Sequence, residues 1–246
     1  MNETAKYDLT IIVPVFNEED NASALEKRLG EFLPTCSRSA CVLFVDDGSR
    51  DRSAELIAGI CERNADMYYI RFAANCGLSA AIKAGFDAAE SPLVGYIDAD
   101  LQTAPEDFNK LLEYADDYEL VMGIRAERKD SAFKRLQSKI ANGFRRAMTG
   151  DKALDTGCPL KVLHTDVARR VPMFTGMHRF LPALVGLQNG RVQQVPVRHF
   201  PRVAGVSKFS LRNRLIGPMM DCFGFRWMRP RWYNYRIADT DLKPKA

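Results

Sequence analysis

Short apolar runs alternate with amphipathic segments along the first half of the chain. The apolar runs predict β-strands at residues 9–16, 41–47, 67–72, 92–98 and 120–124. Between them, apolar residues at helical spacing predict helices at residues 21–33, 51–62, 78–89 and 106–115. Near-continuous apolar strands alternating with amphipathic helices predict an α/β fold, with a mostly parallel sheet sandwiched between helices.

The helix expected at residues 106–115 has its own start signal. Thr103 and Glu106 have the spacing of a capping box around Pro105, so we expect their side chains to cap this helix. No internal repeat, low-complexity segment or linker interrupts the pattern.

Length and composition fit one folded domain with an appendage. The chain has 246 residues, of which 46% are hydrophobic and 27% charged. The first ten residues are polar and the apolar run after them is short, so we expect no secretory signal and no membrane span. Six cysteines without CxxC spacing favour reduced thiols over a zinc site or a disulfide framework.

The small net charge of +4 conceals a strong asymmetry. Residues 1–120 contain 10 Lys and Arg against 23 Asp and Glu, whereas residues 121–246 contain 25 against 8. An uneven but merely solvated surface is one explanation. The sharper hypothesis is that the second half meets an anionic partner such as phosphate, a membrane surface or nucleic acid.

Acidic side chains follow three of the predicted strands directly. They are Glu18 after the first strand, Asp46 and Asp47 after the second, and Asp98 and Asp100 after the fourth. Because the carboxyl ends of parallel strands share one sheet edge, we expect these acids to form one site. Carboxylate and amide oxygens suit Mg²⁺ or Mn²⁺, so Asp98, Asp100 and Gln102 are expected to hold a metal and, through it, a diphosphate.

Each motif also has a simpler explanation. A lone Asp-x-Asp after a strand often caps the next helix, and "DDGS" is a common turn sequence. Asp155-Thr156-Gly157 matches the aspartic-protease triplet, but that chemistry needs a paired copy in an all-β setting. The chain contains no phosphate-binding GxxxxGK[ST] loop and no GxGxxG after the first strand. None of His164, His178 and His199 has metal or triad spacing, which favours structural roles.

The motifs in combination are far more specific than any one alone. In order, "TIIVPVFNEEDN", "VLFVDDGSRDRS", Asn75-x-Gly77 and "YIDADLQTAPED" resemble the family 2 glycosyltransferases of GT-A fold. The later segments "MGIRAERKDSAFKRLQSKIAN", "DTGCPLKVL", "HRFLPAL" and "PVRHFPRVAGVSKF" resemble the dolichyl- and polyprenyl-phosphate sugar transferases. The resemblance covers roughly residues 9–215.

The resemblance implies roles for particular positions. Nucleotide-sugar binding is implied for Pro14, Val15, Phe16, Glu18, Asp46, Asp47, Asp98, Ala99, Asp100, Arg202 and Lys208. Metal binding is implied for Asp98, Asp100 and Gln102, and binding of the acceptor's phosphate for Arg125, Lys134, Arg135, Ser138 and Ser207. The residues expected to act in catalysis are Asp98, Asp100 and Arg125. Phe16 departs from the pattern, because many relatives have Tyr there.

The implied reaction is an inverting transfer of a sugar from a nucleoside-diphosphate sugar to a polyprenyl phosphate, with Mg²⁺ or Mn²⁺. A lipid phosphate has its second pKa at about 6 and is already an anionic nucleophile, so no general base is expected. The cytoplasmic membrane face is the expected location, with a membrane-embedded partner protein or a homo-oligomer left open and no nucleic acid. The sugar, the base and the polyprenyl length stay undetermined.

The expected organisation is a GT-A domain at residues 1–211 and a membrane-interface tail at residues 212–246. Within the domain, residues 1–120 form the nucleotide and metal half and residues 121–211 the acceptor half. Pro218, Asp221 and Pro230 are expected to break the tail into short amphipathic segments rich in Trp and Arg. Alternatives are a different membrane acceptor, a nucleotidyltransferase or a non-catalytic membrane scaffold.

Overall fold

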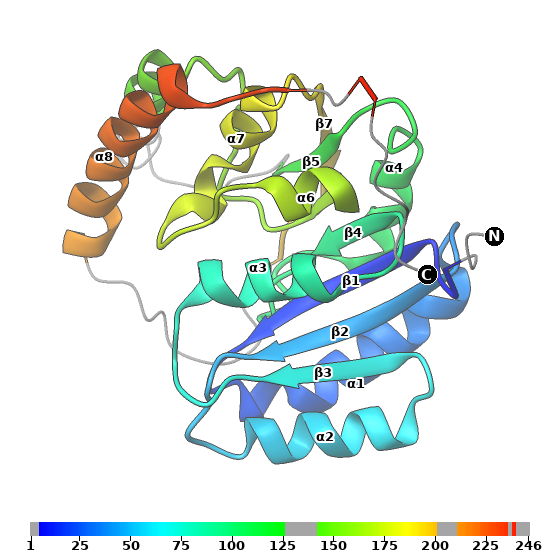
Figure 1. Ribbon diagram of the computed structural model, residues 1–246. Helices are drawn as coiled ribbons and strands as arrows, with labels where there is room; N and C mark the ends of the chain where they lie inside the picture. Colours follow the sequence, from blue (N-terminus) through cyan, green and yellow to red (C-terminus); the bar gives the residue numbers. More distant parts are fainter. Residues whose placement is uncertain (1–4, 126–141, 201–210, 236–237, 240–246) are drawn as a thin grey trace.

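The protein is built around one seven-stranded sheet (Figure 1). The structure is a computed structural model that describes residues 5–125, 142–200, 211–235 and 238–239, with the backbone alone at 211–216. The strands are β1 (Leu9–Val15), β2 (Ala40–Asp46), β3 (Met67–Arg71), β4 (Leu93–Tyr96), β5 (Leu120–Arg125), β6 (Lys161–His164) and β7 (Val192–Val197). Their order in the sheet is β3-β2-β1-β4-β6-β5-β7.

Six of these strands run in one direction and β6 runs against them. The pairs β1–β2, β1–β4, β2–β3 and β5–β7 are parallel, whereas β6 pairs antiparallel with both β4 and β5. The mostly parallel sheet expected from the apolar runs is therefore confirmed. The residues of the second half extend this sheet rather than forming one of their own.

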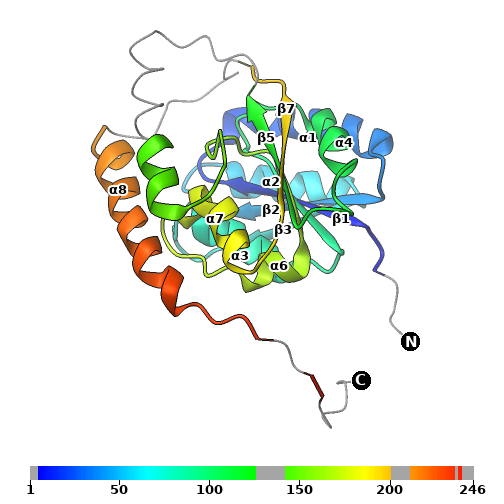
Figure 2. The ribbon, with the colours of Figure 1, turned by 90° about the horizontal axis from the view of Figure 1, so that it is seen from above.

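Helices cover both faces of the sheet (Figures 1 and 2). The α-helices are α1 (Ala22–Phe32), α2 (Ser53–Arg63), α3 (Leu78–Ala88), α4 (Phe108–Leu112), α6 (Thr165–Arg170), α7 (Leu181–Leu187) and α8 (Leu211–Met228), and residues 142–149 are also helical. Short 3₁₀ helices are η1 (Glu19–Asn21), η2 (Leu33–Thr35), η3 (Pro105–Asp107), η4 (Met177–Phe180) and η5 (Arg229–Arg231).

Two hydrophobic layers result from side chains that alternate along the strands. Ile11 and Val13 of β1 face the layer formed with α1, α2 and α4, where Leu25, Leu29 and Phe32 pack as their spacing predicted. Ile12 of β1 faces the opposite layer, formed with α3, α6, α7 and α8. The sheet is therefore buried on both faces, which explains why its strands read as continuous apolar runs.

The capping box expected at Thr103 and Glu106 is wrong. Thr103 is buried and forms a β-bridge with His199, and its hydroxyl has no hydrogen-bond partner among the described residues. Glu106 instead accepts hydrogen bonds from Arg28 and Arg198. Because the strand-like bridge turns Thr103 away from the helix start, the segment begins as η3 and continues only into the short α4.

The tail differs from the broken segments expected at Pro218. Helix α8 continues through Pro218 to Met228, and Pro230 lies within η5. Cys222 and Phe225 are buried in the core, and the ring of Phe225 stacks on Phe180 with centroids 6.3 Å apart. This packing holds the helix together beyond the proline. No helix in the described part of the chain is long and apolar enough to cross a membrane.

Candidate functional site

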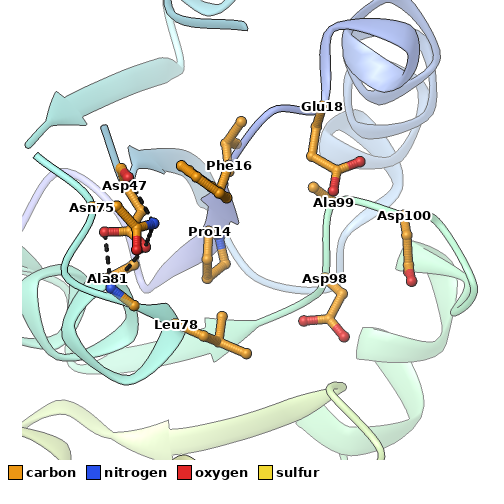
Figure 3. Close-up of a pocket in the computed structure, with 12 residues that line it drawn as sticks. Pro14, Phe16, Glu18, Asp47, Asn75, Leu78, Ala81, Asp98, Ala99 and Asp100 are labelled. Atoms are coloured by element: carbon orange, nitrogen blue, oxygen red, sulfur yellow. Dashed lines mark hydrogen bonds between the residues drawn. The ribbon is translucent and has the colours of Figure 1, made fainter. Parts of the chain in front are cut away.

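A pocket of about 330 Å³ lies where β1, β2 and β4 end (Figure 3). We call it the acidic pocket, and it is lined by Pro14, Val15, Phe16, Glu18, Asp47, Asn75, Gly77, Leu78, Ala81, Asp98, Ala99 and Asp100. Acidic residues that follow three different strands thus meet at one site, as the strand-end argument predicted.

Asp47 organises the wall of this pocket rather than leaving its carboxylate exposed. The carboxylate accepts hydrogen bonds from Asn75 Nδ2 at 2.7 Å, Cys76 N at 2.6 Å and Gly77 N at 2.9 Å. These bonds fix the loop that starts α3 (Figure 3). Gly48, at φ +68°, permits the turn, because a Cβ there would lie 2.6 Å from the backbone of Ala74.

Asp46 does not line the acidic pocket. Its side chain is buried, Oδ1 accepts a hydrogen bond from Ser49 N at 3.1 Å, and Oδ2 lies 3.3 Å from Arg71 Nε. That Oδ2 atom has no hydrogen bond among the described residues. The role in nucleotide binding expected for Asp46 therefore stays a prediction, with Asp47 nearer to the pocket space.

Glu18 and the ring of Phe16 form the opposite wall (Figure 3). The backbone N–H of Glu18 donates to Ser53 Oγ at 2.7 Å, and its carboxylate accepts from Asn21 Nδ2 at 2.6 Å. Asn17 between them has φ +52°, a left-handed backbone that is unfavourable for most residues other than glycine. A strained residue thus sets the direction of its two neighbours.

The loop after β4 carries Asp98 and Asp100 into the same pocket. Tyr96 Oη donates to Asp98 Oδ1 at 2.5 Å, and Gln102 N donates to Asp100 Oδ1 at 3.2 Å. Leu101 has φ +53°, so this loop also contains a left-handed residue beside the pocket. The side chain of Gln102 points elsewhere, because its Nε2 donates to the carbonyl of Phe200 at 3.5 Å.

The donor set at this loop fits a hard divalent cation. The carboxylates of Asp98 and Asp100, separated by one residue, line the same pocket, and Asp100 is only 9% exposed. No cluster of three His, Cys, Asp or Glu side chains suited to a metal occurs among the described residues. Mg²⁺ and Mn²⁺ commonly use one or two carboxylates and complete their shell with water and substrate phosphate, which two aspartates permit.

A second pocket, of about 390 Å³, adjoins the first. We call it the cationic pocket, and it is lined by Leu78, Tyr96, Asp98, Arg125, Thr156, Gly157, Cys158, Pro159, Lys161, His178, Arg179 and Pro218. Leu78 and Asp98 line both pockets. The two pockets are therefore neighbours at Asp98.

Arg125 is held in place by Asp155. The guanidinium donates through Nε and Nη2 to the two carboxylate oxygens, each at 2.7 Å. Gly157 leaves room for this pair, because a Cβ there would lie 3.0 Å from Arg125 Nη2. The Asp155-Thr156-Gly157 triplet thus positions an arginine, which supports the rejection of a protease role. A bidentate pair fixes the plane of the guanidinium toward the cationic pocket.

Lys161 is a functional candidate that sequence reasoning missed. It is 2% exposed, its Nζ donates to the carbonyl of Cys158, and it lies 5.5 Å from the ring centroid of Tyr96. Burial lowers the pKa of Lys161, and the nearby Asp98 and Asp155 partly oppose that shift. Burial also raises the pKa of Tyr96, which therefore stays protonated as the donor to Asp98. No motif in the sequence assigns a role to Lys161.

Several predicted site residues cannot be placed. Lys134, Arg135, Ser138, Arg202, Ser207 and Lys208 lie outside the described residues. Their implied roles in binding the acceptor's phosphate and the diphosphate stay predictions.

The chain is similar to known sugar transferases. The model of glycosyl transferase family 2 matches residues 10–172. An undecaprenyl-phosphate 4-deoxy-4-formamido-L-arabinose transferase from Edwardsiella ictaluri is 35% identical over 215 residues, which are 87% of this chain and 66% of that protein. The same-named protein of Pseudomonas aeruginosa strain LESB58 is 35% identical over 87% of this chain and 63% of its own length. The chain thus spans slightly less than two thirds of these relatives.

Solved structures share the fold at low sequence identity. A mannosyltransferase from Pyrobaculum calidifontis, in complex with GDP-Man and Mn²⁺, aligns with a TM-score of 0.65 and 17% identity over 89% of this chain and 63% of that chain. Glucosyl-3-phosphoglycerate synthase from Mycobacterium tuberculosis, in complex with Mn²⁺, UDP-Glc and phosphoglyceric acid, aligns with a TM-score of 0.63 and 15% identity. The alignment covers 89% of this chain and 81% of that chain. The GT-A-like fold expected from the sequence is confirmed by this likeness.

Proposed function

The chain belongs to glycosyl transferase family 2, and from this premise we propose that it transfers a sugar from a nucleoside-diphosphate sugar to a polyprenyl phosphate. The relatives named as undecaprenyl-phosphate sugar transferases support this choice of acceptor. In the proposed reaction, a phosphate oxygen of the lipid bonds to the anomeric carbon as the bond from that carbon to the diphosphate breaks, with inversion.

The observation that carries the proposal is the meeting of two unlike pockets at Asp98. One pocket is lined by acids, which suit a metal-bound diphosphate, and the other by Arg125, Lys161 and Arg179, which suit a second phosphate. A glycosyl transfer between two phosphates needs two such sites within one sugar's width of each other. Adjoining pockets meet that requirement.

On the donor side, Pro14 and Phe16 offer an apolar wall for the nucleotide's base, and Glu18 an acceptor for ribose hydroxyls. Asp98 and Asp100 would hold the divalent metal, which when bound neutralises charge on the departing diphosphate. Tyr96 keeps Asp98 oriented through its hydrogen bond. The choice between Mg²⁺ and Mn²⁺ is part of the test below.

On the acceptor side, Arg125 would hold the lipid's phosphate in line with the anomeric carbon. None of the three histidines is suited to act as a base. His164 Nε2 contacts the carbonyl of Ala115, away from both pockets. Burial lowers the pKa of His178 to about 3 and also lowers that of His199. This agrees with a nucleophile that is already anionic.

Helix α8 would bring the protein to the membrane that holds the acceptor. Its outward side exposes a set of apolar side chains that we call the tail face: Met219, Met220, Phe223 and Trp227. Phe144 packs edge-on against Phe223, with centroids 6.2 Å apart, and the helix continues into Arg229 and Arg231. Aromatic, apolar and cationic side chains together suit an anionic bilayer interface. Pro218 of the same helix lines the cationic pocket, so the pocket lies beside this surface.

The direct experiment incubates purified protein with a polyprenyl phosphate, a panel of UDP- and GDP-sugars, and Mg²⁺ or Mn²⁺. Formation of a polyprenyl-phosphate sugar from one donor is the expected result. The matched control replaces the lipid phosphate with the same polyprenol, which lacks the anionic nucleophile and should give no product. Transfer to the polyprenol or to a polysaccharide, but not to the lipid phosphate, would contradict the proposed acceptor.

A further inference from the structure

His178 occupies the wall between two hollows. It belongs to η4 and lines both the cationic pocket and a neighbouring pocket of about 380 Å³ bounded by Ser79, Gly176 and Asp221. The proposed transfer has so far used none of its chemistry. The hydrogen bond that it forms nevertheless indicates which of its two ring nitrogens carries the proton.

Ser79, in the first turn of α3, fixes the imidazole. Its Oγ lies 2.7 Å from His178 Nδ1 and accepts a hydrogen bond from Gly176 N at 3.1 Å. Ser79 is 5% exposed, and among the described residues its hydroxyl hydrogen has one acceptor, Nδ1. Because a buried hydroxyl hydrogen without an acceptor is costly, Ser79 donates to Nδ1, and the ring proton is on Nε2.

The surroundings keep the ring neutral. Burial is the main cause of its low pKa of about 3, and the charges of Arg179 and Lys161 add to it. Nε2 has no hydrogen-bond partner in the described part of the chain. The residue lines both pockets, so its ring borders open space. The pocket side of His178 is therefore a rigid, uncharged N–H donor.

We propose that His178 is a substrate-binding residue whose Nε2–H donates to an oxygen atom held beside Asp98 in the cationic pocket. The inference rests on the proposed function and deepens it. That oxygen comes either from a hydroxyl of the transferred sugar or from the acceptor's phosphate. Among Arg125, Lys161 and Arg179, a neutral donor adds direction without a further buried charge. A site that hydrogen-bonds a substrate oxygen discriminates against analogues that lack it.

The tautomer can be tested without any turnover. Protein labelled with ¹⁵N-histidine should show His178 as the Nε2–H tautomer at pH 6 to 8, with no titration down to pH 5. In Ser79→Ala the Nδ1 acceptor bond is lost, and a mixture of tautomers should appear. An Nδ1–H tautomer in the unchanged protein, or titration near the ordinary histidine pKa of about 6.5, would overturn the proposal.

Binding and kinetics then identify the oxygen. His178→Leu removes the donor, and His178→Gln restores an N–H near the position of Nε2. If the sugar supplies the oxygen, His178→Leu should bind the nucleotide sugar roughly three- to tenfold more weakly yet bind the nucleoside diphosphate normally. If the acceptor's phosphate supplies it, nucleotide-sugar affinity should hold and KM for the lipid phosphate should rise by a similar factor, with Gln recovering part of either loss.

His164→Gln is the matched control, since His164 lies outside both pockets. This variant should leave nucleotide-sugar affinity and KM for the lipid phosphate unchanged. Unchanged binding and KM in a folded His178→Leu protein would overturn the proposal. Absence of transfer by the unaltered protein would instead contradict the proposed function, and the tautomer and the two binding affinities would still be measurable.

Discussion

The acidic and cationic pockets are built in opposite ways. The acids of the first follow β1, β2 and β4 within a few residues, and backbone N–H groups hold Asp47 and Asp100. The cations of the second come from β5, β6 and η4, and two of them, Arg125 and Lys161, are partly or fully buried with side-chain or carbonyl partners. The acidic pocket is thus encoded locally, within a few residues of each strand end, whereas the cationic pocket requires the whole fold.

Asp100→Asn should produce the largest effect, because Asp100 is one of the two carboxylates proposed to hold the metal and, through it, the donor. We expect transfer to fall at least about a hundredfold, with Mn²⁺-dependent nucleotide-sugar binding also reduced. Calorimetry and a turnover assay measure both. Asp87→Asn is the control, since Asp87 pairs with Lys83 on the surface of α3. Normal turnover by folded Asp100→Asn would remove the basis for calling this pocket the metal site.

Asp155→Asn tests the cationic pocket alone. The variant loses the charge that holds Arg125, so kcat/KM for the lipid phosphate should fall about thirtyfold while nucleoside-diphosphate affinity stays unchanged. Asp151→Asn is the matched control, because Asp151 binds the buried Arg145 at 2.9 Å but lines neither pocket. If Asp155→Asn lowers donor affinity and spares lipid use while Asp151→Asn changes neither, the assignment of the two pockets is reversed.

The tail face tests how the acceptor reaches the cationic pocket. Truncation before α8 would expose the core around Phe225, so surface substitutions are the cleaner change. Phe223→Ser with Trp227→Ser should reduce sedimentation with anionic vesicles about tenfold and raise KM for the lipid. Added salt should weaken the binding that remains. Tyr69→Ser is the control, because Tyr69 is half-exposed on the edge strand β3, and it should leave vesicle binding unchanged. If Tyr69→Ser and the double variant lose vesicle binding equally, membrane contact lies elsewhere than on the tail face.

Lys161→Met should produce the smallest effect, a change in the pH dependence of stability. Burial makes the folded-state pKa of Lys161 lower than its unfolded value of about 10.5. The unfolded chain therefore binds this proton more tightly, and the cost to folding, complete at low pH, disappears as pH rises toward the unfolded pKa. In urea unfolding, the unaltered protein should gain stability relative to Lys161→Met as pH rises toward about 10.5. If the free energies of unfolding of the two proteins change with pH in parallel, the charge of Lys161 is not buried.

The acidic pocket was largely predictable from sequence. Apolar runs located β1, β2 and β4, and strand direction then placed Glu18, Asp47, Asp98 and Asp100 at one edge. The particular contacts were not predictable. The carboxylate of Asp47 holds the loop at Cys76 and Gly77, an arrangement that depends on the path of the chain after β3, and its expected role at the nucleotide stays a prediction.

The cationic pocket was predictable only through Arg125, which the family resemblance supplied. Lys161 reads in sequence as one charged position of a short strand, and burial becomes visible only when β6 lies between β4 and β5. His178 reads as an isolated histidine until Ser79, distant in sequence, bonds to it. The capping prediction at Thr103 was wrong for the same reason, because Thr103 forms a β-bridge with His199, which is distant in sequence.

The antiparallel β6 also has a consequence for how the protein is made. Strands β1 to β4 can pair with one another as soon as they leave the ribosome. This favours early folding of the sheet edge that carries the acidic pocket. β5 has no ladder to β4 and must wait for β6, which is synthesised later and inserts between them. Such long-range pairing is slow. The nascent chain can therefore form the sheet edge that carries the acidic pocket before it forms the cationic pocket, and the side of β4 that later pairs with β6 stays unpaired in the interval.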